Sequence, residues 1–155
     1  MSRRHGIWIL SLCAALLAGC DGAPEELDGG TPPGDAATPN PFEAQVARGG
    51  ALFGANCARC HGADGSGTAI APRLVGLAEG ALPLDPPASR MVRTAQFVTV
   101  GDVAAFASVN MPADAPGSLT TDEYYAILAF DLSANGIDLE TELTAEIAAG
   151  LTIPR

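Results

Sequence analysis

The chain has 155 residues, and its formal net charge at pH 7 is −10 because 18 acidic residues outnumber 8 basic ones, all of them arginines. This length suits a single domain with additional terminal segments. So acidic a surface repels phosphate groups, which excludes nucleic acid and makes anionic lipid headgroups poor partners. The charge favours instead a protein partner that presents a basic docking patch.

Residues 1–19 are predicted to be a signal peptide. A basic start at residues 2–5 precedes an apolar run at residues 6–18, which is shorter than the ~20 residues that a membrane-spanning helix needs. The Leu-Ala-Gly-Cys sequence at residues 17–20 resembles the lipobox of bacterial lipoproteins, so we expect Cys20 to be acylated. Lipid would then anchor the protein on the periplasmic side of the cell envelope, with the inner membrane favoured. The alternative is ordinary cleavage after a small residue, which would leave a soluble periplasmic protein.

Residues 20–40 are predicted to be a flexible acidic linker, because Gly, Pro, Ala, Thr and acidic residues dominate them and Leu27 is their one large apolar side chain. Such a stretch cannot bury enough surface to offset the entropy lost on ordering. A flexible chain of this length spans about 25 Å on average, enough to lift a small domain off a membrane. We assign the domain itself to residues 41–133 and a C-terminal extension to residues 134–155.

The first helix of the domain is predicted from its start signals. Asn40 suits the N-cap, Pro41 the first helical position and Glu43 the third. Four residues then share one helical face: Phe42, Val46, Gly49 and Phe53. Because a glycine inside a helix costs about 1 kcal/mol relative to alanine, Gly49 on this face predicts that another helix passes close by. The helix runs into Cys57.

The most informative stretch is Cys57-Ala58-Arg59-Cys60-His61. Its two thiols lie about one helical turn apart, so both can bond to the vinyl groups on one porphyrin edge, and the imidazole that follows can ligate the iron. A dithiol redox pair or a zinc knuckle shares the CxxC spacing, but such zinc sites need four ligands and usually a second pair, which the sequence lacks. We therefore predict one haem c, attached to Cys57 and Cys60, with His61 as an axial ligand.

Two further helices are predicted from capping-box patterns. Thr99 and Asp102 open a short helix whose apolar residues we expect to face inward: Val103, Phe106, Ala107 and Val109. Thr120 and Glu123 open an apolar helix that contains Tyr125, Ile127, Leu128, Phe130 and Leu132. In the C-terminal extension residues 144–149 suit one more short helix, and we expect the extension to pack against the core.

Taken together, these motifs resemble the class I monohaem cytochromes c over roughly residues 42–135. The resemblance implies an all-α, cytochrome c-like fold, in which three to five short helices wrap around one covalently bound haem. In that family the first and last helices cross at a glycine and aromatic residues, which correspond here to Gly49, Phe53 and Phe130.

The resemblance also implies roles for the loop after the motif. The sequence at residues 71–74, Ala-Pro-Arg-Leu, looks like the family's loop in which a proline carbonyl accepts the proximal imidazole's Nδ1 proton. Pro72 would then orient His61 and raise its basicity, and Leu74 would pack on the ring. An ordinary turn is the alternative. Three arginines are candidates for pairing with the haem propionates, or else are solvated surface residues: Arg73, Arg90 and Arg93.

Met111 is the predicted sixth ligand of the iron. Once the leader is removed, the remaining methionines are Met91 and Met111, and no second histidine competes. Pro112 ends the preceding helix and leaves Met111 on an irregular segment, and the family places its axial methionine in the same Asn-Met-Pro context. Met91, flanked by arginines, is interpreted as a packing or surface residue. Methionine ligation implies a raised reduction potential.

A haem with both axial positions filled has no open position for a substrate, which favours one-electron transfer through an exposed haem edge. We predict a membrane-tethered, extracytoplasmic one-electron carrier, which is not an enzyme and exchanges electrons with redox proteins. One alternative is the cytochrome subunit of a periplasmic dehydrogenase or oxidase complex. Another is a haem sensor or peroxidase-like protein whose sixth ligand is labile.

Overall fold

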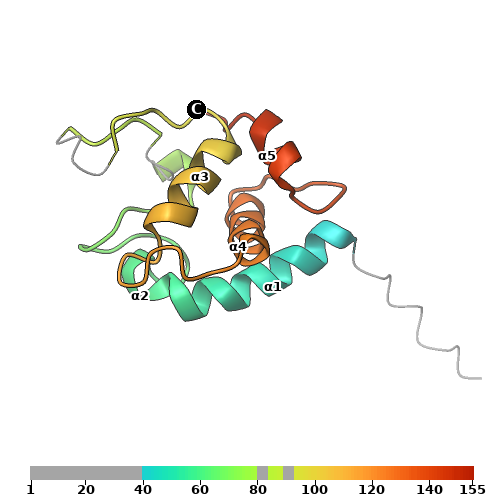
Figure 1. Ribbon diagram of the computed structural model, residues 1–155, viewed down its shortest axis with the longest axis horizontal. Coiled ribbons are helices and arrows are strands. Elements are labelled where there is room, and N and C mark those ends of the chain that lie inside the picture. The colour runs from blue at the N-terminus through green and yellow to red at the C-terminus, as the bar shows by residue number, and fades with distance from the viewer. Residues whose placement is uncertain (1–39, 80–83, 89–92) are drawn as a thin grey trace, which may run out of the picture. The chain divides into compact units, whose positions relative to one another are not determined.

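The computed structural model describes residues 40–79, 84–88 and 93–155. Its helices, shown in Figure 1, are α1 (Pro41–Asn56), α2 (Ala58–His61), η1 (Leu77–Glu79), α3 (Val100–Asn110), α4 (Thr121–Ala134) and α5 (Ala145–Gly150). Within these ranges the only β-type pairing is an isolated bridge between Thr99 and Thr152. The prediction of an all-α fold is therefore confirmed. The predicted signal peptide, Cys20 and the linker up to residue 39 lie outside the described residues, as do Arg90 and Met91.

The starts of α1, α3 and α4 are fixed by side chains that pair with main-chain groups. In α1 the Asn40 side chain accepts a hydrogen bond from the Glu43 N–H (2.8 Å), while the Glu43 carboxylate accepts one from the Asn40 N–H (3.1 Å). The same reciprocal arrangement starts α3 at Thr99 and α4 at Thr120. These contacts satisfy N–H groups that a helix start otherwise leaves unpaired. The two predicted capping boxes, at Thr99 and Thr120, are confirmed, and the predicted N-cap Asn40 forms a third.

The contact between α1 and α4 centres on Gly49. A Cβ at this position would lie 1.8 Å from the main-chain oxygen of Ala126, so only a residue without a side chain permits this approach. Beside it the rings of Phe53 and Phe130 pack with their centroids 5.1 Å apart. The predicted close helix neighbour at Gly49 is therefore confirmed, and α4 also contacts α3 (Figure 1).

The C-terminal extension completes the core. Three of its apolar residues are buried: Leu143, Ala148 and Ile153. They pack in one cluster with Phe42 of α1 and with buried residues of α4. A buried side chain on α1, Gln45, joins the extension to the first helix by donating to the Leu143 carbonyl (3.0 Å) and accepting from the Leu143 N–H (2.7 Å). The expected packing of the extension is confirmed. Gln45 was not expected to be buried.

The expectation that Val109 faces inward is wrong, because its side chain is 68% exposed. The buried residues of α3 are Val100 and Ala104. At about 100° of rotation per residue, Val109 lies about 140° around the helix from Ala104 and so on the outer side.

In the described part of the chain, no helix has the length and apolar character needed to span a membrane.

Candidate haem-binding site

The Cys57–His61 motif lies at the junction of α1 and α2. Cys57 caps the end of α1 and precedes α2, and its carbonyl accepts hydrogen bonds from the N–H groups of Cys60 (3.0 Å) and His61 (2.9 Å). Both thiols are half-buried and not joined in a disulfide, and the His61 ring is buried. One tight turn thus presents two thiols and an imidazole together.

The chemistry of Cys57 argues against a reactive dithiol. Burial, and to a lesser extent the nearby Asp131 and Cys60, raise the pKa of the Cys57 thiol to about 11. Dithiol redox enzymes instead lower a thiol pKa so that a thiolate is present. A thiol held in its protonated form is a poor nucleophile, so this environment does not favour dithiol redox chemistry. In the described ranges no three His, Cys, Asp or Glu side chains come together as they would around a metal ion.

The orientation of His61 is set by a main-chain oxygen. The His61 Nδ1 atom lies 2.8 Å from the Pro72 carbonyl oxygen. With Nδ1 as the donor, the Nε2 atom keeps its lone pair, which is the form of imidazole that binds iron. The tautomer and orientation of His61 therefore fit a haem ligand.

Close packing of the following loop places that carbonyl. The Gly67 N–H donates to the His61 carbonyl (2.7 Å), and Gly67 has φ +83°. A Cβ at Gly67 would lie 2.7 Å from the Arg73 nitrogen and 3.1 Å from the Pro72 carbonyl carbon. Glycine at this position therefore lets the loop close against the Pro72 carbonyl that faces His61.

The far end of the loop is tied to the end of α4. The Asn135 side chain donates to the Leu74 carbonyl (2.9 Å) and accepts from the Gly76 N–H (2.9 Å). Leu74 is half-buried, and its N–H bonds to the Gly65 carbonyl (2.8 Å). The loop carrying Pro72 is thus fixed both to the motif and to the last core helix.

Met111 lies where α3 ends. It caps that helix in an extended conformation, its side chain is half-buried, and its carbonyl accepts a hydrogen bond from the Tyr124 hydroxyl (2.6 Å). Three residues later, Asp114 forms an ion pair with Arg59 of the motif (2.7 Å). The structure therefore brings the segment that carries Met111 next to the turn that carries His61.

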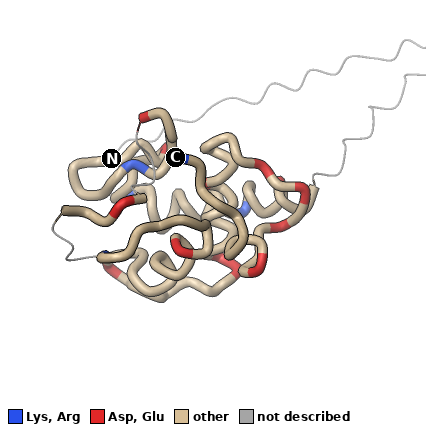
Figure 2. The backbone as a smooth tube through the Cα atoms, turned by 90° about the horizontal axis from the view of Figure 1, so that it is seen from above, with Lys and Arg blue, Asp and Glu red and all other residues tan. Residues whose placement is uncertain are grey.

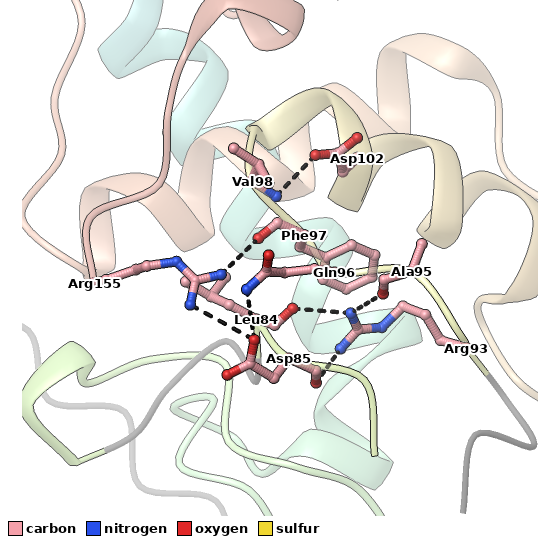
Figure 3. A network of polar contacts seen from close by, with 9 residues as sticks. All are labelled: Leu84, Asp85, Arg93, Ala95, Gln96, Phe97, Val98, Asp102 and Arg155. Atoms are coloured by element: carbon pink, nitrogen blue, oxygen red, sulfur yellow. Dashed lines mark hydrogen bonds and ion pairs between the residues drawn. The ribbon is translucent and has the colours of Figure 1, made fainter. Parts of the chain in front are cut away.

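Two of the three candidate arginines are engaged with main-chain carbonyls. Arg73 donates to the Val75 carbonyl (2.9 Å). Arg93 donates to the carbonyls of Leu84 (3.0 Å) and Asp85 (2.7 Å), and its guanidinium lies 3.6 Å from the centre of the Phe97 ring. Figure 3 shows that the contacts of Arg93 join the segment at residues 84–85 to the segment that leads into α3. Their pairing with propionates stays a prediction.

A residue that the sequence analysis missed is Asp131, on the buried side of α4. Its side chain is 6% exposed, its Oδ1 atom has no hydrogen-bond partner, and burial raises the pKa of its carboxyl to about 8. It lies among apolar residues that line a small cavity: Val100, Val103, Leu128, Leu132 and Ile153. The available signal was an acidic residue within the apolar stripe of the last helix.

Comparison with known proteins agrees with this geometry. Residues 46–134 match the family described as Cytochrome c. Among solved structures, the chain is similar to a chain of the sulfane dehydrogenase SoxCD from Paracoccus pantotrophus, with 28% sequence identity and a TM-score of 0.51. That alignment covers 88% of this chain and 68% of the other. No curated protein shows a significant match.

Proposed function

The chain belongs to the cytochrome c family, and from that premise we propose that it is a one-electron carrier whose single haem c is ligated by His61 and Met111. The haem, when bound, supplies a one-electron couple at its iron. Cys57 and Cys60 hold it covalently. The protein's part is to fix the two axial side chains and to exclude other ligands.

The observation that carries this proposal is the contact between His61 Nδ1 and the Pro72 carbonyl. It holds the imidazole in one tautomer and directs Nε2 away from the loop, as a permanent ligand requires. The Tyr124 hydroxyl likewise fixes the main chain of Met111. An anchored methionine favours a closed coordination sphere, and so supports electron transfer rather than catalysis or sensing.

The partner that we propose is a redox protein with a basic docking surface. Acidic residues are spread along the described chain and basic ones are few (Figure 2). Arg59, which lies within the motif itself, is paired with Asp114, so its charge is offset locally. Association with a basic partner would then be fast at low salt and slower as ionic strength rises.

We also propose that lipid on Cys20 tethers the protein to the periplasmic side of a membrane, with residues 20–40 as the spacer. The lipobox-like sequence supports this. Cell fractionation tests it: Cys20→Ala should move the protein from the membrane to the soluble fraction, whereas Cys13→Ala in the leader should not. Retention of Cys20→Ala in the membrane would contradict the tether.

A second candidate is supported by the likeness to SoxCD, whose name describes a sulfane dehydrogenase. In this alternative the chain would be the haem subunit of an oxidoreductase complex. Purification from detergent-solubilised membranes separates the two. A free carrier should elute as a monomer after a salt wash, whereas a subunit should elute with a stoichiometric partner.

Carbon monoxide tests the closed coordination sphere. The reduced protein should not bind carbon monoxide, because Met111 occupies the sixth position. Met111→Ala should open that position and give a carbon monoxide adduct, and the control Met91→Ala should behave as the unaltered chain. Binding by the unaltered chain would overturn the proposal in favour of a sensor or peroxidase-like protein.

A further inference from the structure

Asp131 occupies an unusual place for a carboxyl group. It lies on α4 within the apolar core, and its Oδ1 atom accepts no hydrogen bond. Its neighbour in sequence, Phe130, packs on Phe53 with the ring centroids 5.1 Å apart, and the Phe53 carbonyl accepts a hydrogen bond from the Cys57 N–H (2.8 Å). The Asp131 carboxylate also contributes to raising the pKa of the Cys57 thiol. A haem attached to Cys57 would therefore have its porphyrin edge on the side of α4 that carries this carboxyl. Burying a carboxylate without a partner costs free energy, so the group needs either a compensating charge or a proton.

No described charge compensates Asp131. Val100 and Val103 of α3, Leu128 and Leu132 of α4, and Ile153 of the extension line its cavity, and all are apolar. On α3, Asp102 accepts from the N–H groups at the helix start, and in the extension Arg155 bonds to the Phe97 carbonyl and to Asp85. On α1, which also packs against α4, Glu43 accepts from the Asn40 N–H and Arg48 is exposed. Cys57 no longer titrates once it is a thioether. The haem, when bound, would therefore be the charged group to which Asp131 responds.

We propose that Asp131 is a redox-linked proton site, which binds one proton when the haem is reduced and releases it when the haem is oxidised. The inference rests on the one-electron function proposed above. When a redox partner delivers one electron, ferric haem becomes ferrous and the Asp131 carboxylate takes one proton from solvent to become the carboxylic acid. Oxidation reverses both changes, so charge near the attachment edge is conserved across the cycle.

The direction of the coupling follows from charge. Reduction removes one positive charge from the haem, so a nearby carboxylate is less stabilised and its proton affinity rises. Burial already raises the pKa of Asp131 to about 8, so protonation changes fall near physiological pH. The midpoint potential should therefore fall as pH rises through this region. For one proton and one electron the limiting slope is about 59 mV per pH unit, which corresponds to a tenfold change in proton concentration.

The test measures the midpoint potential of the haem-loaded protein from pH 6 to pH 10 at constant ionic strength. The unaltered chain should show a falling potential around pH 8. Asp131→Asn and Asp131→Leu should remove this fall. Asp122→Asn, the same chemical change in the exposed first turn of α4, should keep it. If both Asp131 variants retain the slope, other titrating groups such as the propionates cause it and the proposal is overturned.

A second measurement needs only the unaltered chain. Redox-difference infrared spectra at pH 8 should show a carboxylic-acid carbonyl band that appears on reduction and shifts in D₂O. Absence of such a band overturns the proton site. A reversible one-electron couple without this band would refute Asp131 alone, whereas the absence of a reversible couple would refute the electron-carrier function.

Discussion

Replacement of Gly49 by alanine perturbs the contact on which the fold depends most directly. The added Cβ would lie 1.8 Å from the Ala126 oxygen and 2.5 Å from the Ala126 carbonyl carbon. Because ordinary contacts need about 3.5 Å, α1 and α4 would have to separate by more than about 1.5 Å at this point. The opposing atoms belong to a helix backbone, so no side-chain rotation can relieve the clash.

The magnitude follows from two opposed terms. Alanine is favoured over glycine within a helix by about 1 kcal/mol. Overpacking of a core typically costs about 1–3 kcal/mol and sometimes more, and a clash with a rigid backbone belongs at the upper end. We therefore expect Gly49→Ala to lower the free energy of unfolding by about 2 kcal/mol or more, a large share of the stability of a small domain.

Gly54 provides the matched control, because it lies in the same helix and a Cβ there would meet nothing within 4 Å. Gly54→Ala should raise the free energy of unfolding by up to about 1 kcal/mol. Guanidinium chloride unfolding followed by circular dichroism measures both variants, and covalent haem stays attached to the unfolded chain. Equal effects of the two substitutions, or a stabilising effect of Gly49→Ala, would refute the close contact between α1 and α4.

Three further predictions follow from the polar contacts. Gln45→Met should lower the free energy of unfolding by about 2 kcal/mol or more, because the Leu143 N–H and carbonyl would lose their hydrogen bonds. Unfolding in urea measures this, and an unchanged free energy of unfolding would contradict it. Asp131 carries a proton in the folded protein between its ordinary pKa of 3.8 and about 8, where the unfolded chain has lost it. Stability should therefore fall as pH rises through that window, and Asp131→Asn should remove the fall; unfolding curves with the same pH dependence would count against it. Gly67→Ala should displace the Pro72 carbonyl from His61, weaken the imidazole as a donor and raise the midpoint potential, which potentiometry would show; an unchanged or lower potential would be inconsistent with that role.

Local chemistry made the helix starts predictable from the sequence. The capping boxes at Asn40, Thr99 and Thr120 depend on residues only three positions apart, so the sequence contains the whole interaction. Gly49 could be interpreted as well, because its poor helix propensity needs a compensating contact. The motif at Cys57 adds a histidine directly after the CxxC pair, and this combination is typical of haem attachment.

Burial of polar residues was not predictable in the same way. Gln45 and Asp131 are buried by segments far along the chain, and although Asp131 interrupts an apolar stripe, the local sequence does not say which segments cover either residue. Val109 is apolar but exposed, because its angular position on α3 directs it to the outer side of the helix. Tertiary packing overrides local hydrophobicity at these positions.

A spectroelectrochemical titration of the purified haem-loaded protein tests the central claim most directly. The account predicts one haem per chain that titrates reversibly as a one-electron couple, with a sulfur-to-iron charge-transfer band in the oxidised form that disappears on reduction and is absent from Met111→Ala. A colourless protein, or an oxidised haem without this band in the unaltered chain, would contradict ligation by His61 and Met111.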